Sequence, residues 1–396
     1  MIGISKLYCD TTERSDALRY GHGRERSAQP APDRRPVVVW NATRRCNLKC
    51  MHCYSHSDDA PAGDEMTADE GRALIDDLAG FGSPVILFSG GEPLTRPDLY
   101  DLAAHAAERG IRAAISTNGT LIDDAAAARL KEAGIAYAGV SLDGLRETND
   151  AFRCVDGAFD RALAGIRACK RAGVKVGVRF TISRHTAADI PGIFDLIEAD
   201  EIPRACFYHL VYTGRGSDLA ADDLTHDETR RAVDLIIDRT ADLHRRGLAK
   251  EILTVDNHSD GPYLYLRMQR DEDPRADRVL ELLRRNGGNS SGVGIGCVSW
   301  DGSVYADQFW RRHSFGNVRE RPFSEIWQDL SDPLMAKLKE KHKHVKGRCA
   351  ACRFLDACAG NLRARAEAVT GDVWAAEPAC YLTDKEIDIT PEGCGS

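Results

Sequence analysis

Three cysteines near the start of the chain are spaced closely enough to bind one metal centre. They are Cys46, Cys50 and Cys53, in a C-x3-C-x2-C pattern. Residues 37–40, just before them, are apolar and predict a buried strand. Three thiolates at the exit of such a strand can hold three irons of one [4Fe-4S] cube, which leaves the fourth iron open to a substrate or cofactor. The alternatives are a zinc site that borrows His52 or His56, and three ordinary buried thiols.

A second group of cysteines follows near the other end of the chain. Its members are Cys349, Cys352, Cys358 and, after a gap, Cys380, and the first three form a C-x2-C-x5-C pattern. Four thiolates are enough to close off a second cluster, and the same four would also hold a zinc ion. The spacing alone leaves both options open.

Length and composition limit the class of protein. The chain has 396 residues, 43% hydrophobic and 29% charged, which is typical of a soluble globular protein with one large α/β domain and a smaller one. A net charge of -8 gives no support for a nucleic-acid surface, and no apolar run is long enough to span a membrane. Thirteen cysteines without an export signal indicate a reducing cytoplasm and metal ligation. Residues 1–35 are polar and predict an exposed or loosely ordered arm.

The apolar pattern from residue 36 to 212 predicts the scaffold that positions these motifs. Short apolar strands alternate with amphipathic helical segments at intervals of roughly 30 residues. Strands are predicted at 37–41, 85–89, 112–116, 137–141, 175–181 and 205–211, and helices at 68–81, 97–109, 123–133, 158–172 and 189–199. Six such units predict a parallel sheet with functional groups at the carboxyl ends of its strands. Periodicity does not choose between an open sheet and a barrel.

Two further regions complete the predicted organisation. Residues 213–296 are charged and predict a mostly helical connector, with helices at 227–248 and 277–286. Residues 297–396 form a smaller, cysteine-rich unit. In that unit Asp301-Gly302 predicts a hairpin turn, and residues 323–338 predict one helix.

Glycines and small polar residues end several of the predicted strands. They are Gly90, Gly91, Glu92 and Pro93 after the second strand, Ser116 and Asn118 at the third, and Ser141 at the fourth. Two adjacent glycines let a ligand approach the backbone, although the motif taken alone is more often an ordinary turn. The polar side chains can bind a ribose or carboxylate, or cap a loop. Arg179 lies amid apolar neighbours on the fifth strand, where it needs an anion from a protein carboxylate or a ligand.

The order of these motifs resembles that of the radical S-adenosylmethionine (SAM) enzymes with a SPASM/twitch C-terminal extension. The resemblance implies an α/β fold, a partial (β/α)6 TIM-like barrel followed by a smaller cluster-binding extension. It implies that the first three cysteines hold a SAM-binding [4Fe-4S] cluster and the four later ones an auxiliary [4Fe-4S] cluster. It further implies that the glycine motif with Glu92 binds the amino group of SAM. The polar strand-end residues would contact its ribose and carboxylate, and Arg179 its carboxylate.

The extension often binds a second auxiliary cluster through an earlier Cys-x(9–15)-Gly-x4-Cys segment. Here Gly302 is followed by Asp307 at the position of the later cysteine. Cys297 is only five residues ahead of Gly302, too close for the earlier one. The pattern therefore argues against a second auxiliary cluster, and Cys297 is interpreted as a core thiol, a substrate contact or a stray ligand.

Longer agreement indicates the tetrapyrrole-modifying branch of these enzymes, above all the haem d1 biosynthesis (NirJ-type) group. The segments that carry it are 41–46, 289–292, 307–310, 316–319, 348–349 and 378–384. The resemblance implies reductive cleavage of SAM to a 5′-deoxyadenosyl radical, and hydrogen abstraction from a propionate of 12,18-didecarboxysirohaem. It also implies a reducing partner such as flavodoxin or ferredoxin. A tetrapyrrole with several carboxylates favours cationic and aromatic neighbours, and the candidates are Arg215, Trp310, Arg311, Arg312 and His313. His313 is also a candidate axial iron ligand or proton donor.

Two other functions compete with this one. A radical SAM/SPASM maturase that modifies a ribosomal peptide shares the motifs. Such enzymes usually carry a peptide-recognition domain before the barrel, whereas 36 residues precede the first predicted strand here. A separate carrier protein could serve instead. A non-enzymatic iron–sulfur electron carrier has no use for a SAM pocket. We therefore expect a cytoplasmic, tetrapyrrole-modifying enzyme with no nucleic-acid or membrane partner.

Overall fold

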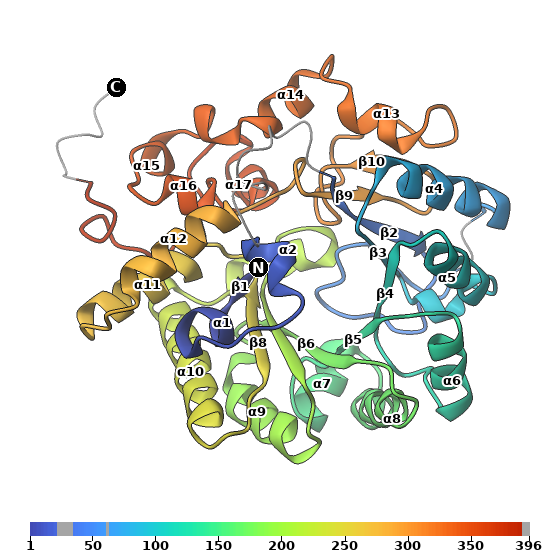
Figure 1. Cartoon of the computed structure of the whole chain (residues 1–396), viewed down its shortest axis with the longest axis horizontal. Coiled ribbons are helices and arrows are strands. Elements are labelled where there is room, and N and C mark those ends of the chain that lie inside the picture. Colours follow the sequence, from blue (N-terminus) through green and yellow to red (C-terminus); the bar gives the residue numbers. More distant parts are fainter. Residues whose placement is uncertain (22–34, 61–62, 390–396) are drawn as a thin grey trace.

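One curved sheet of ten strands organises the computed structural model, which describes residues 1–21, 35–60 and 63–389 (Figure 1). Its middle consists of parallel strands in chain order, each hydrogen-bonded to the next. They are β2 (Val37–Thr43), β3 (Val85–Gly90), β4 (Arg112–Thr117), β5 (Tyr137–Ser141), β6 (Val176–Ile182) and β7 (Arg204–His209). Most residues of β2 and β7 are buried, as expected for parallel strands that are covered on both faces.

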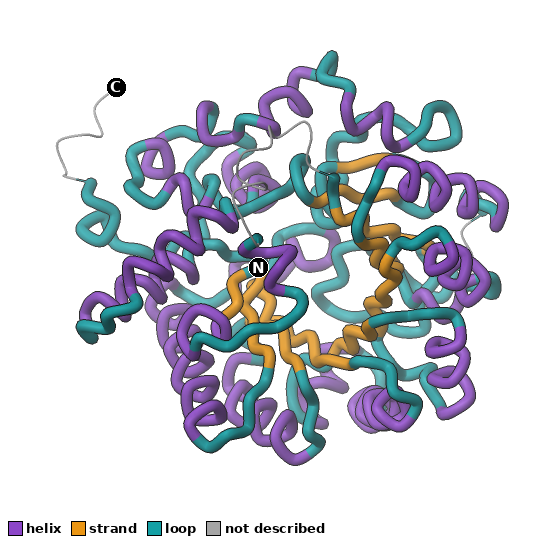
Figure 2. The backbone as a smooth tube through the Cα atoms, in the orientation of Figure 1, coloured by secondary structure: helices purple, strands orange, loops and turns teal. Residues whose placement is uncertain are grey.

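Four short strands extend this sheet at its two ends. β8 (Glu251–Val255) is parallel to β7, and β9 (Ile295–Val298) is parallel to β2. β1 (Ile2–Gly3) and β10 (Val304–Tyr305) pair antiparallel at the outer edges. In the described part of the chain β1 and β10 lie at opposite ends of the strand order, so the sheet is an open arc, drawn in orange in Figure 2. The predicted partial barrel of six β-α units is confirmed.

Helices cover the outside of the arc (Figure 1). They are α4 (Ala68–Phe81), α5 (Leu99–Glu108), α6 (Asp124–Glu132), α7 (Arg146–Arg153), α8 (Ala158–Arg171), α9 (Ile190–Ala199) and α10 (His226–Arg245). The connections contain the 3-10 turns η2 (Pro93–Thr95), η3 (Ala187–Asp189) and η4 (Gly214–Asp222). Local signals set their ends. Thr67 and Glu70 form a capping box before α4, and Gly82 ends that helix in a left-handed conformation with φ 85°.

The prediction of an exposed or loosely ordered N-terminal arm is wrong for residues 1–21. β1 is followed by α1 (Ile4–Cys9) and α2 (Asp16–Tyr20), and β1 pairs with β8. Ile2, Ile4 and Leu7 are buried in the main core. These few apolar side chains are enough to dock the segment because each one packs against the rest of the core, and no local periodicity reveals such packing. The part of the prediction that covers residues 22–34 lies outside the described residues.

The connector contains more than the predicted helices. α10 and α12 (Ala276–Asn286) correspond to the two predicted helices, whereas α11 (Asp260–Arg270) and the strand β8 were not predicted. β8 has only five residues and begins with Glu251, so it lacks the length and polarity pattern of a typical strand. All five of its residues are nevertheless buried. The connector therefore adds one more parallel strand to the barrel wall.

The C-terminal unit joins the barrel through β9, and it contains shorter helices than predicted. The single helix expected over 323–338 is wrong: α13 (Phe323–Gln328) and α14 (Pro333–Lys339) are separate, because Pro333 lacks the N–H that a continuous helix needs there. The remaining elements are η5 (Lys341–Lys343), α15 (Gly347–Ala350), α16 (Leu355–Cys358) and α17 (Arg363–Thr370). The predicted hairpin at Asp301-Gly302 is present as β9 and β10, and Gly302 has φ 85°. None of the helices in the described residues is long and apolar enough to cross a membrane.

Candidate functional site

A cavity opens where the parallel strands end, with about 1040 Å³ of empty space including its mouth. Most of the predicted site residues line it together: Cys46, Cys50, Cys53, Gly90, Gly91, Ser116, Asn118, Ser141 and Arg179. Parallel strands bring their carboxyl ends to one edge of a sheet, which is why residues far apart in the chain meet here. Glu92 and Pro93 are the predicted residues of this group that do not line the cavity.

The three cysteines of the first motif lie in the loop that follows β2, and the groups around them fit sulfur atoms that carry negative charge. The backbone N–H of Leu48 donates to Cys46 Sγ at 3.4 Å, and Arg153 Nη1 donates to Cys50 Sγ at 3.4 Å. Burial raises the pKa of the Cys46 thiol to about 12, so an unligated thiol there stays protonated at neutral pH. A bound iron would hold the thiolate form instead.

The spacing of these cysteines also bears on the choice of metal centre. Among the residues that the structure describes, no three His, Cys, Asp or Glu side chains are close enough to hold a single metal ion. The cysteines of an iron–sulfur cube each bind a different iron and are therefore farther apart than the ligands of one zinc ion. Three thiolates match the number that a cube with one open iron takes from the protein.

Arg153, at the end of α7, is a cavity residue that the sequence reading missed. Its Nη2 is paired with the fully buried carboxylate of Asp143, and its Nε has no partner among the described residues. Asp143 also accepts from the backbone N–H of Thr181 at 2.5 Å. These contacts hold a guanidinium beside Cys50 inside the cavity. The only sequence signal is Asp143, two residues after Ser141, the last residue of β5.

Arg215 was predicted as a substrate contact, and the structure gives it a different place. Its Nε donates to Cys50 O at 2.8 Å and its Nη1 to Ser57 O at 3.1 Å. Its backbone N–H donates to Cys53 O at 2.9 Å. Arg215 therefore binds backbone carbonyls of the cysteine loop and does not line the cavity. Through these contacts η4, which contains Arg215, fixes the shape of the loop.

The glycine motif packs directly against the first residues of the cysteine loop. The N–H of Gly91 donates to Thr43 O at 2.8 Å, and the N–H of Glu92 donates to Arg45 O at 2.8 Å. Gly90 has φ 120°, a conformation that other residues rarely adopt. The glycines therefore allow the backbone after β3 to pack closely against the backbone that leads into the cysteine loop, in addition to any contact with a ligand.

Gly91→Ala should disrupt this junction. A Cβ at Gly91 would lie 2.1 Å from Arg45 O and 2.6 Å from Arg44 O. Relief requires moving the strand that leads into Cys46, so we expect the free energy of unfolding to fall by about 3 kcal/mol or more, together with loss of the first cluster. Chemical denaturation and iron analysis after anaerobic reconstitution measure both effects. A matched control is Gly80→Ala in α4, where a Cβ meets nothing within 4 Å. Wild-type values for Gly91→Ala would contradict the prediction.

Glu92 holds the next strand end in place. Its carboxylate accepts from Thr117 Oγ1 at 2.7 Å, from Asn118 N at 2.7 Å and from Leu94 N at 3.2 Å. Burial raises the pKa of Glu92 to about 7, against these hydrogen bonds, which favour the charged form. Glu92 thereby links the glycine motif to Asn118. Its predicted contact with the amino group of SAM stays a prediction.

Arg179 faces the cavity without a carboxylate partner in the described residues. Its guanidinium lies 4.6 Å from the centre of the Tyr208 ring, and no ion pair within 4.0 Å joins it to a described Asp or Glu. This arrangement leaves the guanidinium available to an anionic ligand. The predicted contacts of Arg179, Ser116 and Ser141 with SAM stay predictions.

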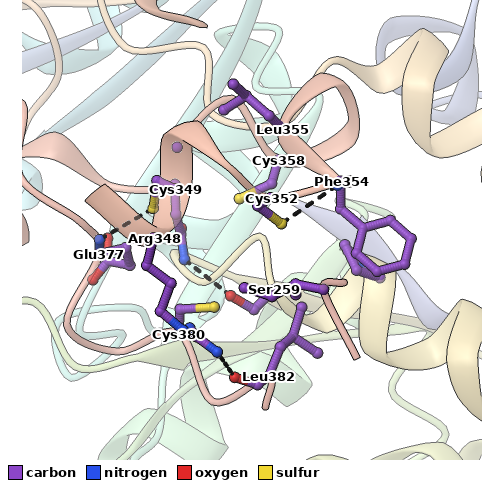
Figure 3. A pocket seen from close by; sticks show the side chains of 14 residues that line it. Ser259, Arg348, Cys349, Cys352, Phe354, Leu355, Cys358, Glu377, Cys380 and Leu382 are labelled. Carbon is purple, nitrogen blue, oxygen red and sulfur yellow. Dashed lines mark hydrogen bonds between the residues drawn. The ribbon is translucent and has the colours of Figure 1, made fainter. Parts of the chain in front are cut away.

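The four later cysteines surround a second, smaller cavity with about 390 Å³ of empty space (Figure 3). Cys349 Sγ accepts from Glu377 N at 3.3 Å, and Cys352 Sγ accepts from Phe354 N at 3.4 Å. Burial raises the pKa of the Cys352 thiol to about 11. Four converging sulfurs with N–H donors in a mostly apolar wall fit an iron–sulfur cluster that is fully ligated by the protein.

Asp307 occupies the position of the missing cysteine, and its side chain is committed to the protein. Its carboxylate accepts from Ser291 Oγ at 2.5 Å, from Phe309 N at 2.8 Å and from Trp310 N at 2.9 Å. Burial raises its pKa. Cys297 is fully buried and packs in a small core cluster with Val39 and Tyr305. The placement of Cys297 agrees with its interpretation as a core thiol.

The other predicted substrate contacts also have protein partners. Trp310 Nε1 donates to Glu367, His313 Nε2 bonds to Asp332, and the Arg311 guanidinium lies 4.0 Å from the Trp300 ring centre. Arg312 is exposed. The residues of this segment that do reach the first cavity are Gln308 and Phe309. The sequence marks both only as part of the segment 307–310, because nothing local distinguishes them from their neighbours.

Known proteins share this arrangement. Residues 40–197 match the radical SAM superfamily, and residues 294–353 match an iron-sulfur cluster-binding domain, SPASM. The chain is 62% identical over 394 residues to the Fe-coproporphyrin III synthase of Methanosarcina barkeri, which covers 98% of this chain and 99% of that protein. It is 42% identical over 378 residues to the pre-heme d1 synthase of Dinoroseobacter shibae, which covers 93% of each.

A solved structure supports the fold. SuiB of Streptococcus suis, bound to its precursor peptide SuiA, matches with a TM-score of 0.71 and 18% identity, over 88% of this chain and 76% of SuiB. At that identity the likeness concerns the fold alone.

Proposed function

The chain belongs to the radical SAM superfamily and carries a SPASM domain, and on this basis we propose that it processes the carboxylate-bearing side chains of an iron tetrapyrrole. The observation that carries the proposal is the 62% identity with a Fe-coproporphyrin III synthase over nearly the whole of both chains. The two domains imply three groups: SAM, the [4Fe-4S] cluster that binds it, and an auxiliary iron–sulfur cluster. The donor sets described above fit both clusters.

The residues of the first cavity have distinct tasks in this proposal. Cys46, Cys50 and Cys53 hold the first cluster, and Arg153 balances the negative charge on Cys50. When bound, the cluster and SAM supply a 5′-deoxyadenosyl radical that takes a hydrogen atom from the substrate. Gly90 and Gly91 let the amino acid end of SAM approach the backbone. Ser116, Asn118, Ser141 and Arg179 line the same cavity and would bind its ribose and carboxylate.

A buried chain of contacts joins the auxiliary site to the first cavity. The N–H of Glu377 donates to Cys349, and its carboxylate pairs with Arg365 Nη1 at 3.1 Å, with both side chains fully buried. Arg365 Nη2 in turn donates to Leu210 O at 3.0 Å, and Leu210 lines the first cavity. These contacts link Cys349 to the wall of the first cavity, where the substrate would bind. A low-potential one-electron donor such as flavodoxin or ferredoxin would reduce the first cluster.

Two tetrapyrrole reactions are candidates. Formation of Fe-coproporphyrin III is favoured over propionate removal of the haem d1 type, because the relative named for the former is 62% identical and the one named for the latter 42%. In either case we propose 12,18-didecarboxysirohaem as the substrate. A peptide substrate is less favoured, because the peptide-bound neighbour shares only the fold.

The test is a turnover experiment with anaerobically reconstituted protein, SAM, dithionite and 12,18-didecarboxysirohaem. We expect 5′-deoxyadenosine, a shift of the Soret band, and a product whose mass is that of Fe-coproporphyrin III. A product that has lost two propionates would move the assignment to the haem d1 type. If the tetrapyrrole neither shifts the Soret band nor changes in mass while SAM is still cleaved, the proposed substrate class is wrong.

A further inference from the structure

Asp256 is a cavity residue to which neither the sequence motifs nor the proposed function gives a role. It directly follows β8, the strand that was not predicted from the sequence. It lines the first cavity beside Tyr208, His209 and Leu210, at the end of β7. The residues expected to bind the cluster and SAM come from β2 to β6, so Asp256 lies beyond the SAM motifs, on the edge of the cavity formed by β7 and β8.

Two features of Asp256 destabilise the folded protein when no ligand is bound. Its Oδ2 is shielded from solvent and has no hydrogen-bond partner among the described residues. Its backbone has φ 65°, in the left-handed region that few residues with a side chain adopt, with Asn and Asp the most frequent among them. Unpaired buried polar atoms and left-handed backbone occur together mainly at functional sites, where the surrounding structure enforces them.

A hydrogen bond from Arg365 holds the backbone of Asp256 in this conformation. Arg365 Nη2 donates to the backbone O of Asp256 at 2.9 Å, and Arg365 is fixed by its buried ion pair with Glu377. The protein thus holds the main chain of Asp256 in the strained conformation and leaves the side-chain oxygen free in the cavity.

A comparison within the chain shows that burial alone does not explain this. Asp223 is also a largely buried aspartate whose pKa is raised by burial. Its carboxylate nevertheless accepts from Tyr212 Oη at 3.0 Å and from Leu224 N at 2.8 Å, and it lies outside the first cavity. Oδ2 of Asp256 is also buried, but it accepts no hydrogen bond from the described residues.

The charges around Asp256 set its protonation. Burial raises its pKa to about 6, and the negative charge of Asp307 acts in the same direction. The amino group of Met1 and the guanidinium groups of Arg365 and Arg179 act against it. A carboxyl group with such a pKa keeps a neutral fraction near neutral pH and can then donate a hydrogen bond, as buried acids do in oxyanion sites.

We propose that Asp256, in its neutral form, donates a hydrogen bond from Oδ2 to a carboxylate side chain of the substrate tetrapyrrole. A substrate carboxylate only accepts hydrogen bonds, so it needs a donor from the protein. An ionised Asp256 would repel the substrate carboxylate instead. The inference rests on the proposed function, because it requires a substrate with anionic side chains in this cavity. It assigns the β7–β8 edge of the cavity to the substrate.

The test is a Soret titration of the cluster-loaded protein with 12,18-didecarboxysirohaem, in the absence of dithionite, between about pH 6 and pH 8. Binding needs the proton on Asp256, so the wild-type affinity should fall toward about tenfold per pH unit above the pKa. Asp256→Asn keeps a donor at the same place, and its affinity should fall less steeply with pH than that of the wild type. Asp256→Ala should lose roughly tenfold to a hundredfold in affinity at the lowest pH. Asp223→Asn is the matched control and should behave as the wild type does.

The outcomes separate the two proposals. If the wild type shows no Soret shift at any pH, the tetrapyrrole function fails and the inference fails with it. If the wild type binds, and both Asp256 variants bind with its affinity and its pH dependence, only the Asp256 inference is overturned. The cluster absorbance of each variant shows that it is folded and loaded.

Discussion

Cys50→Ala is expected to abolish the reductive cleavage of SAM while leaving the auxiliary cluster in place. Cys50 is buried beside Arg153, and the alanine variant keeps only two of the three thiolates of the first motif. A cube with two protein ligands is not retained, and the guanidinium of Arg153 then faces an apolar methyl group. We expect 5′-deoxyadenosine formation to fall by roughly a thousandfold or more, and the iron content to fall by one cluster.

Chromatography of 5′-deoxyadenosine, iron analysis and low-temperature EPR of the reduced protein measure this effect. Cys154→Asn provides a matched control one residue after Arg153. Cys154 is exposed and has φ 58°, a conformation that asparagine tolerates. The control should keep the wild-type iron content and SAM cleavage. If Cys50→Ala retained the SAM-dependent change of the EPR spectrum, the assignment of the first cluster to this loop would be wrong.

The residues that could be predicted from the sequence are those whose chemistry depends on near neighbours. Cys46, Cys50 and Cys53 lie within one loop, and Gly90 and Gly91 end a strand whose apolar pattern is unmistakable. Both groups are therefore found by spacing and periodicity. The parallel arrangement of the strands then places them at one edge, as observed.

The residues that were missed depend on partners far away in the chain. Arg153 contacts Cys50, 103 residues earlier, and Arg365 contacts Asp256, 109 residues earlier. Arg215 resembles a free surface cation in the sequence, but its partners are carbonyl groups of the cysteine loop. A charged residue is assigned correctly only when its partner is known, and sequence patterns do not supply the partner. The same limit explains β8 and the N-terminal segment, whose burial is tertiary.

Cys358→Ala is expected to separate SAM cleavage from substrate conversion. Cys358 ends α16 and lines the second cavity with the other three cysteines (Figure 3). Its carbonyl accepts from Asn289 N at 3.1 Å, which ties this ligand to the connector and not to the first cavity. Removal of one of four thiolates should therefore empty the second site and leave the first intact.

The expected result is loss of one cluster of iron, with 5′-deoxyadenosine still formed within about tenfold of the wild-type rate and tetrapyrrole product below detection. Mass spectrometry of the tetrapyrrole and chromatography of 5′-deoxyadenosine, performed on the same reaction, measure the two quantities. Cys297→Ala is the control, because Cys297 is buried but lies outside both cysteine groups. Full iron content in that variant would support its assignment as a core thiol.

If Cys358→Ala kept all its iron and its product yield, the four later cysteines would not be the ligands of the auxiliary cluster. If it lost SAM cleavage as well, the two sites would depend on each other through the Glu377–Arg365 pair, whose disruption by Arg365→Met should then have the same effect.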